Sequence, residues 1–112
     1  MIHWHPLRSE DQLLDLVAVS EQQACLIFKH STSCSISSLA KSRLERNWNL
    51  TTEQLTPYYL DLLLYRELSS QIAGQFGVRH ESPQILLIRD GRCVYDASHL
   101  DIDTAMIEQV LG

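Results

Sequence analysis

Hydrophobic residues recur along the chain in two spacings, one typical of amphipathic helices and one typical of buried strands. Leu13 and Leu16 follow Ser9, a helix-capping residue, at helical spacing and predict a helix over residues 9–20. The continuous apolar run 25–28 is typical of a strand that is covered on both faces. We expect the N-terminus, which contains His3 and His5, to be mobile.

The rest of the chain continues this alternation of helix and strand. The predicted elements are helices over 34–47 and 69–76, a last helix capped by Asp103, and strands over 58–64, 85–88 and 93–95. Asp90-Gly91 joins the last two strands and indicates a hairpin. The order α-β-α-β-α-β-β-α predicts an α/β fold, with one central mixed four-stranded sheet and helices on both faces. Residues 1–112 are expected to form a single domain.

Composition and charge exclude several classes of partner. The 112 residues are 45% hydrophobic and carry a formal charge of -5, whereas a nucleic-acid-binding protein is expected to present a basic face. No run approaches the ~20 apolar residues of a membrane helix, because Asp61 interrupts the most hydrophobic stretch. The start of the chain lacks the pattern of a secretory signal. We therefore expect a cytoplasmic protein with no nucleic-acid or membrane partner.

Cys34 is the main candidate for chemistry. It stands between a polar turn and the predicted helix 34–47, and the start of a helix favours negative charge on a thiol. Ser37 takes the place of the second cysteine in a Cys-x-x-Cys pattern, so no internal disulfide can close there. Its hydroxyl is expected to bond the Cys34 thiolate, and nearby Lys29 and His30 to add positive potential. The alternative is an inert buried cysteine.

The other two cysteines lie within apolar strands. We interpret Cys25 and Cys93 as small core residues, with the alternative that one of them acts as a resolving thiol. His3 and His5 form a pair that is too small to hold a metal ion, since metals usually take three or four protein ligands. No metal site is expected.

Several short motifs together carry a resemblance to a known family. They are Phe28-Lys29-His30-Ser31-Thr32, Cys34-x-x-Ser37, Gln75-Phe76-Gly77-Val78, His80-Glu81-Ser82-Pro83-Gln84, Asp90-Gly91 and Ala97-Ser98-His99. In this order they resemble the thioredoxin fold and, more narrowly, the monothiol bacilliredoxins, or bacillithiol-system redox-active proteins. Two departures are Ser33, where threonine is expected, and Ser35, where proline is frequent in related sites.

This resemblance implies a thiol–disulfide oxidoreductase that removes bacillithiol, a low-molecular-weight thiol, from S-thiolated client proteins through Cys34. A second molecule of the small thiol would be the co-substrate, with no tightly bound cofactor. The resemblance also implies that Ser33, His30, Ser82 and Pro83 contact the substrate. The Ser82–Pro83 bond would be cis and face the cysteine, whereas a trans proline at a strand start is the alternative.

Other interpretations stay open at this point. The resemblance suggests that His80, Glu81 and His99 lie near the site, but they would equally serve as ordinary surface residues. The chain as a whole is alternatively a non-catalytic thioredoxin-like binding module, or a redox sensor whose Cys34 is only thiolated or oxidised. A glutathione-using relative would differ in its co-substrate alone.

Overall fold

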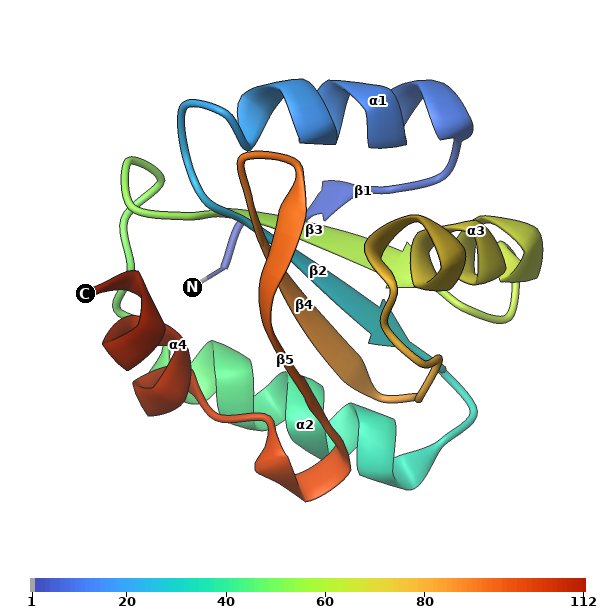
Figure 1. The fold of residues 1–112 in the computed structure, drawn as a ribbon. Coiled ribbons are helices and arrows are strands. Elements are labelled where there is room, and N and C mark those ends of the chain that lie inside the picture. Colours follow the sequence, from blue (N-terminus) through green and yellow to red (C-terminus); the bar gives the residue numbers. More distant parts are fainter. Residues whose placement is uncertain (1) are drawn as a thin grey trace.

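The computed structural model describes residues 2–112, which form five strands and four α-helices with one short 3-10 helix (Figure 1). In chain order the elements are β1 (His5–Pro6), α1 (Glu10–Val19), β2 (Cys25–His30), α2 (Ser35–Asn47), β3 (Thr56–Asp61), α3 (Arg66–Phe76), β4 (Gln84–Arg89), β5 (Arg92–Ser98), η1 (His99–Asp101) and α4 (Thr104–Leu111). Every predicted helix and strand is present. Among the described residues no helix is long and apolar enough to cross a membrane.

The sheet has five strands in the order β1-β3-β2-β4-β5, so the prediction of four strands was wrong. The additional strand is β1, in which His5 and Pro6 pair in parallel with Tyr58 and Tyr59. Two residues are too few to show a period of two, and their pairing depends on a partner about fifty positions away. The start of the chain, expected to be mobile, is thus held at a sheet edge.

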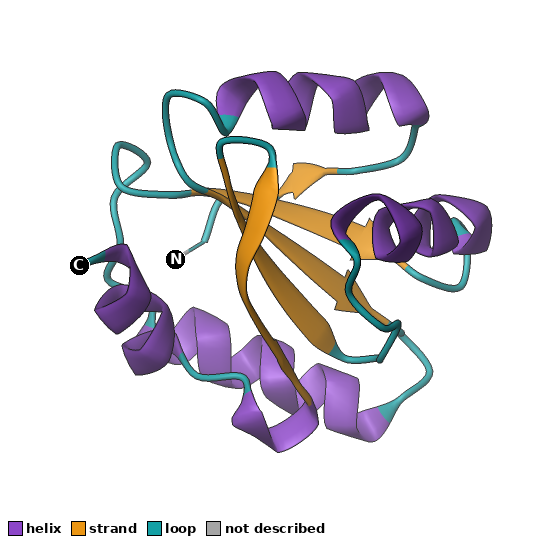
Figure 2. Ribbon diagram, in the orientation of Figure 1, coloured by secondary structure: helices purple, strands orange, loops and turns teal. Residues whose placement is uncertain are grey.

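The pairing within the sheet is mixed, as predicted. Strand β2 is parallel to β3 and antiparallel to β4, and β4 is antiparallel to β5. Helices α1 and α3 cover one face of the sheet and α2 and α4 the other (Figures 1 and 2). The two hydrophobic cores follow from this arrangement, because Ile27 faces Leu16 and Ile72 on one side while Phe28 faces Leu44 on the other. Strand β2 is therefore buried on both faces.

Local signals explain most of the element boundaries. Ser9 accepts a hydrogen bond from the Gln12 N–H, and Asp103 caps α4 in the same manner. Gly77 ends α3 in the left-handed conformation. Asp90 and Gly91 have φ of 53° and 72°, the positive pair that a two-residue hairpin requires.

Strand β3 is displaced from its predicted range, 58–64. It begins at Thr56 and ends at Asp61, whose carboxylate accepts the Leu63 N–H and turns the chain away from the sheet. Helix α3 then begins at Arg66, three residues before the predicted start. The aliphatic residues 62–64, read as strand from their hydrophobicity, form this turn instead.

Candidate active site at the start of helix α2

Cys34 is the N-cap residue of α2. Its backbone is extended, its carbonyl accepts the Ser38 N–H at 3.1 Å, and its side chain makes no capping hydrogen bond. The thiol is free and partly exposed. The first turn of α2 contains no acidic side chain, so no carboxylate of that turn opposes the positive end of the helix dipole. A cysteine placed in this way is open to attack a disulfide from solvent.

The fold brings the Ser82–Pro83 segment to the same end of the sheet. Lys29 pairs with Gln84 in the antiparallel β2–β4 ladder, so the residues after Lys29 run beside those before Gln84. The loop that follows Lys29 leads to Cys34, whose N–H donates to the Ser31 carbonyl in the same loop at 3.2 Å. Figure 1 shows the loop before α2 beside the loop that enters β4. The Ser82–Pro83 bond is cis, as predicted.

Three of the predicted substrate contacts lie at the surface of this region or just beneath it. Ser33 is exposed, with its Oγ 3.3 Å from the Ser31 Oγ. Pro83 is buried, and Ser82 is partly buried. The Ser82 Oγ is enclosed and has no hydrogen-bond partner among residues 2–112. Its hydroxyl thus retains hydrogen-bonding capacity beside the cis proline.

Ser37 and His30, in contrast, face inward. Ser37 is fully buried, and its hydroxyl contacts the His30 Nδ1 at 2.6 Å and accepts the Ser31 N–H at 3.0 Å. No hydrogen bond from Ser37 to Cys34 is present in the described part of the chain. His30 is 4% exposed, and burial, aided by Lys41, lowers its pKa. His30 is therefore neutral at pH 7 and does not add the expected positive potential. Its contact with Ser37 joins α2 to the end of β2, so His30 is not available for the expected substrate contact.

This geometry predicts that Ser37→Ala destabilises the fold. The substitution leaves the buried Ser31 N–H and the His30 ring without their partner, and each unsatisfied buried group costs about 1–3 kcal/mol. We expect a loss of about 2 kcal/mol in the free energy of unfolding, measured by urea denaturation. Ser38→Ala, one position on at an exposed site, is the matched control and is expected to change stability by less than about 0.5 kcal/mol. Equal effects of the two substitutions would contradict the buried role of Ser37.

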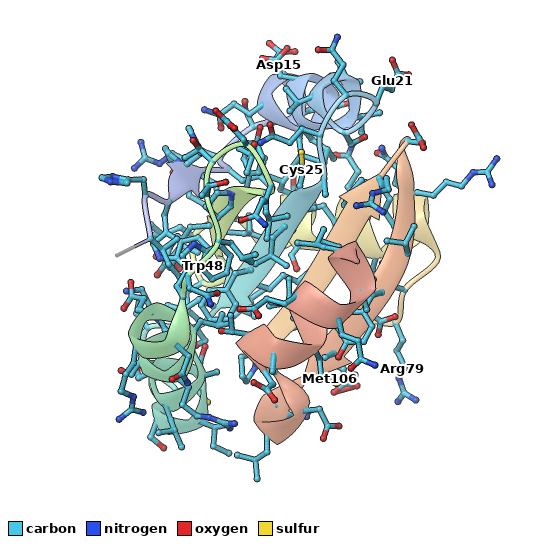
Figure 3. The ribbon with its side chains drawn as sticks, turned by 90° about the vertical axis from the view of Figure 1, so that its left-hand side faces the viewer. Asp15, Glu21, Cys25, Trp48, Arg79 and Met106 are labelled. Carbon is cyan, nitrogen blue, oxygen red and sulfur yellow. The ribbon has the colours of Figure 1, made fainter. Side chains whose placement is uncertain are left out.

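Cys25 and Cys93 lie at the far end of the sheet from Cys34. Cys25 begins β2, about 16 Å from the strand's end at 3.3 Å per residue, and both Cys25 and Cys93 pair with Ile88. Figure 3 shows Cys25 at the α1 end of β2. Burial raises the pKa of Cys25 to about 12, and burial raises the pKa of Cys93 as well. Neither cysteine is placed to resolve a disulfide formed at Cys34.

Lys29 is the unexpected feature of the region. Its side chain is fully buried beneath α3, where its Nζ donates to the Ser69 carbonyl at 3.2 Å and lies 3.3 Å from the His80 Nδ1. Burial lowers the pKa of Lys29 from 10.5 to about 8. Burial and the nearby Lys29 both lower the pKa of His80. Lys29 is therefore mostly charged at pH 7, and at that pH His80 is mostly neutral.

His80 and Glu81 are neighbours in the loop before β4, but their side chains have different partners. Glu81 lies 3.7 Å from the His99 Nε2 and 4.0 Å from the Arg79 Nε, while His80 turns toward Lys29. The Gln84 side chain donates to the Arg79 carbonyl and accepts the Glu81 N–H. His80 lies between these two residues in the loop and is held by both bonds. Of the predicted trio, Glu81 and His99 thus come together. Within residues 2–112 no group of three or more His, Cys, Asp or Glu side chains is arranged to hold a metal ion.

Sequence reasoning did not single out Arg66 and Ser69, which join His80 around a hollow at this end of the sheet. Their grouping depends on where α3 begins, and the hydrophobic pattern placed that start three residues too late. A detectable signal was the alternation of Cys25, Ile27 and Lys29, which puts the lysine on the α3 side of β2.

Comparison with known proteins agrees with this geometry. A proposed oxidoreductase with a thioredoxin fold is 29% identical to the chain, with a TM-score of 0.79 over 96% of this chain and 92% of that one. The thioredoxin of Malassezia sympodialis (16% identical, TM-score 0.73, 99% and 90% covered) and thioredoxin f2 of Chlamydomonas reinhardtii (17%, 0.73, 96% and 95%) share the fold. Residues 5–107 match the family described as monothiol bacilliredoxin BrxC. The chain therefore belongs to the monothiol bacilliredoxin family and has a thioredoxin-like fold.

Proposed function

We propose that this protein is a monothiol thiol–disulfide oxidoreductase that removes bacillithiol, or a similar low-molecular-weight thiol, from S-thiolated proteins. The observation that carries the proposal is the placement of Cys34. It is a free, partly exposed cysteine at the N-cap of α2, and the residue three positions on is a buried serine. Family membership supports a role in thiol redox chemistry.

The reaction proceeds in two exchanges. The Cys34 thiolate attacks the small-thiol sulfur of the client's mixed disulfide, and the client sulfur leaves as a thiolate. Cys34 then carries the small thiol in a new disulfide. A second small-thiol thiolate attacks the small-thiol sulfur of that adduct, so that Cys34 is released as thiolate and the small thiol leaves as its symmetrical disulfide. The client sulfur is reduced and the second small thiol is oxidised, while the first small thiol stays at the disulfide level throughout.

The surroundings of Cys34 support this cycle. Ser37 cannot attack the adduct, and Cys25 and Cys93 lie at the other end of the sheet. An external thiol is therefore required for release. The family resemblance implies that the backbone of Ser82, before the buried Pro83, contacts the substrate, and this segment lies at the same end of the sheet as Cys34. The unpartnered Ser82 hydroxyl adds a polar group there.

The requirement for an external thiol gives the test. A client protein carrying one bacillithiol is mixed with the reduced protein, and released client thiol is followed by mass spectrometry. Without added bacillithiol, release is expected to stop at one equivalent per protein, with the adduct on Cys34. With added bacillithiol, release is expected to continue through many turnovers. Turnover without any added thiol contradicts a monothiol cycle, and an adduct that added thiol cannot remove identifies a sensor.

A further inference from the structure

A hollow of about 290 Å³ opens beside the start of α3, and its lining differs from that of four other hollows in the described part of the chain. Leu62, Arg66, Ser69, Ser70 and His80 line it, and none of these residues is acidic. Four other hollows of the described chain each include at least one carboxylate, among them Glu108, Glu67, Glu53 and Asp61. Arg66 also lines one of those four hollows, together with Glu10 and Glu67. On a chain with a net charge of -5, a hollow lined by an arginine and by no acidic residue is a local reversal of charge.

The cations around this hollow are Arg66, which lines it, and Lys29, which lies behind Ser69 and His80. Among residues 2–112 neither Arg66 nor Lys29 lies within ion-pair distance of a carboxylate. The charge of Lys29 is buried, and a buried charge is costly unless an opposite charge compensates it. Glu81, the nearest carboxylate in sequence to His80, is occupied by Arg79 and His99. An anion that enters the hollow would supply the missing charge.

Lys29 also determines what His80 presents to the hollow. A charged lysine can only donate, so the His80 Nδ1, 3.3 Å from Nζ, is the acceptor. The neutral ring therefore carries its proton on Nε2, and the His80 side chain is exposed. His80 thus presents an N–H donor. Together with the Arg66 guanidinium and the exposed Ser70 hydroxyl, it forms a set of donors without an acid.

The hollow opens at the same end of the sheet as the Cys34 site. Its residue Leu62 donates its N–H to the His30 carbonyl at 2.9 Å, at the end of β2 from which the Cys34 loop starts. His80 is two residues before Ser82, in the loop that runs beside that same segment. A small molecule whose sulfur is bonded to Cys34 would therefore extend from the end of the sheet at which this hollow opens.

We propose that the hollow lined by Arg66 and His80 is an anion subsite of the Cys34 site and binds a carboxylate of the low-molecular-weight thiol. The identity of this ligand rests on the proposed function. Arg66 contributes a planar fork that matches a carboxylate, and His80 contributes its Nε2–H. Lys29 stabilises the bound anion from below without touching it.

Binding is tested first on the reduced protein without any disulfide. Succinate, its neutral diamide and inorganic phosphate are titrated at constant ionic strength, and the His80 ring protons are followed by NMR. Succinate is expected to give saturable shifts and the diamide none. Arg66→Gln is expected to weaken succinate binding at least about fivefold, and Arg92→Gln, the same charge change on the exposed part of β5, less than about twofold. Equal effects of the two variants, or tighter binding of phosphate than of succinate, overturn the proposal.

Kinetics then separate this subsite from the function of Cys34. Mixed-disulfide formation at Cys34 is measured with dithiodipropionate, which carries carboxylates, and with the neutral bis(2-hydroxyethyl) disulfide. The ratio of the two rates is expected to fall at least about fivefold in Arg66→Gln and to be retained in Arg92→Gln. An unchanged ratio in Arg66→Gln overturns the subsite even where Cys34 reacts. Failure of Cys34 to react with either disulfide, while succinate still binds, refutes the proposed function and leaves the anion subsite supported.

Discussion

Cys34→Ser is expected to abolish removal of the small thiol from an S-thiolated client, with a fall in rate of at least about 10³-fold, the order of effect seen when a nucleophile is removed. The serine hydroxyl stays protonated at neutral pH and does not attack a disulfide sulfur. The Cys34 side chain makes no capping hydrogen bond, so the substitution breaks no such contact. Thermal unfolding of the variant is expected to match that of the native protein, so the loss reports chemistry.

Cys93→Ser is the matched control for this experiment. Cys93 is the other partly exposed cysteine, its Sγ lies 3.3 Å from the Tyr95 carbonyl, and a serine hydroxyl can make the same bond. Client release is expected to stay within about twofold of the native rate, the range of surface substitutions. If release of the client thiol survives in Cys34→Ser but is lost in Cys93→Ser, the reactive cysteine is Cys93 and the assignment of Cys34 is wrong.

The parts of this fold that were predictable are those with local causes. Hydrophobic spacing identifies the helices, and capping or turn residues such as Ser9, Gly77 and Asp90 mark where the chain changes direction. Strand β1 has no local cause, since only its pairing with Tyr58 and Tyr59 makes it a strand. The β3 boundary was missed because the Asp61 side chain, rather than a change in hydrophobicity, ends the strand.

In the candidate site, too, the features with a local sequence motif were predictable and those that depend on distant contacts were not. Cys34 at the start of a helix and the Ser82–Pro83 bond were predicted from short motifs. The contacts of Ser37 were not, because the spacing from Cys34 gives one helical turn but not the position of His30 at the end of β2. Lys29 was read as part of a polar turn, since a charge after an apolar run usually marks an exposed strand end. Strand β2 continues past it instead, and the lysine is buried.

Lys29→Met is expected to make the protein more stable. The drop in the Lys29 pKa from 10.5 to about 8 corresponds to roughly 3 kcal/mol of cost for the charged form at neutral pH. Methionine has a similar length and no charge, and replacing buried charges with apolar residues often stabilises by about 1–4 kcal/mol. We expect a gain of about 2–3 kcal/mol in urea unfolding at pH 7. Lys41→Met, at the only other lysine, is the control and should change stability by less than about 1 kcal/mol.

The pH dependence of this gain identifies its cause. Between pH 8 and 10.5 the unfolded chain holds the Lys29 proton more tightly than the folded protein, so native stability rises with pH across that window. The advantage of Lys29→Met is therefore full below pH 8 and falls toward zero near pH 10.5. Cys25 and Tyr58 also titrate under alkaline conditions, but they are present in both proteins and cancel in the difference. A gain that stays constant to pH 10.5 would reflect packing instead of charge.

A more stable variant raises the question of why the lysine is there, and the anion subsite supplies an answer. With the lysine removed, His80 loses its charged donor, and the hollow loses the buried cation that stabilises a bound carboxylate. Lys29→Met is therefore expected to lower the preference for dithiodipropionate over the neutral disulfide while it raises the free energy of unfolding. Opposite changes in stability and in anion preference, caused by one substitution, would show that the buried charge serves binding at the expense of the fold.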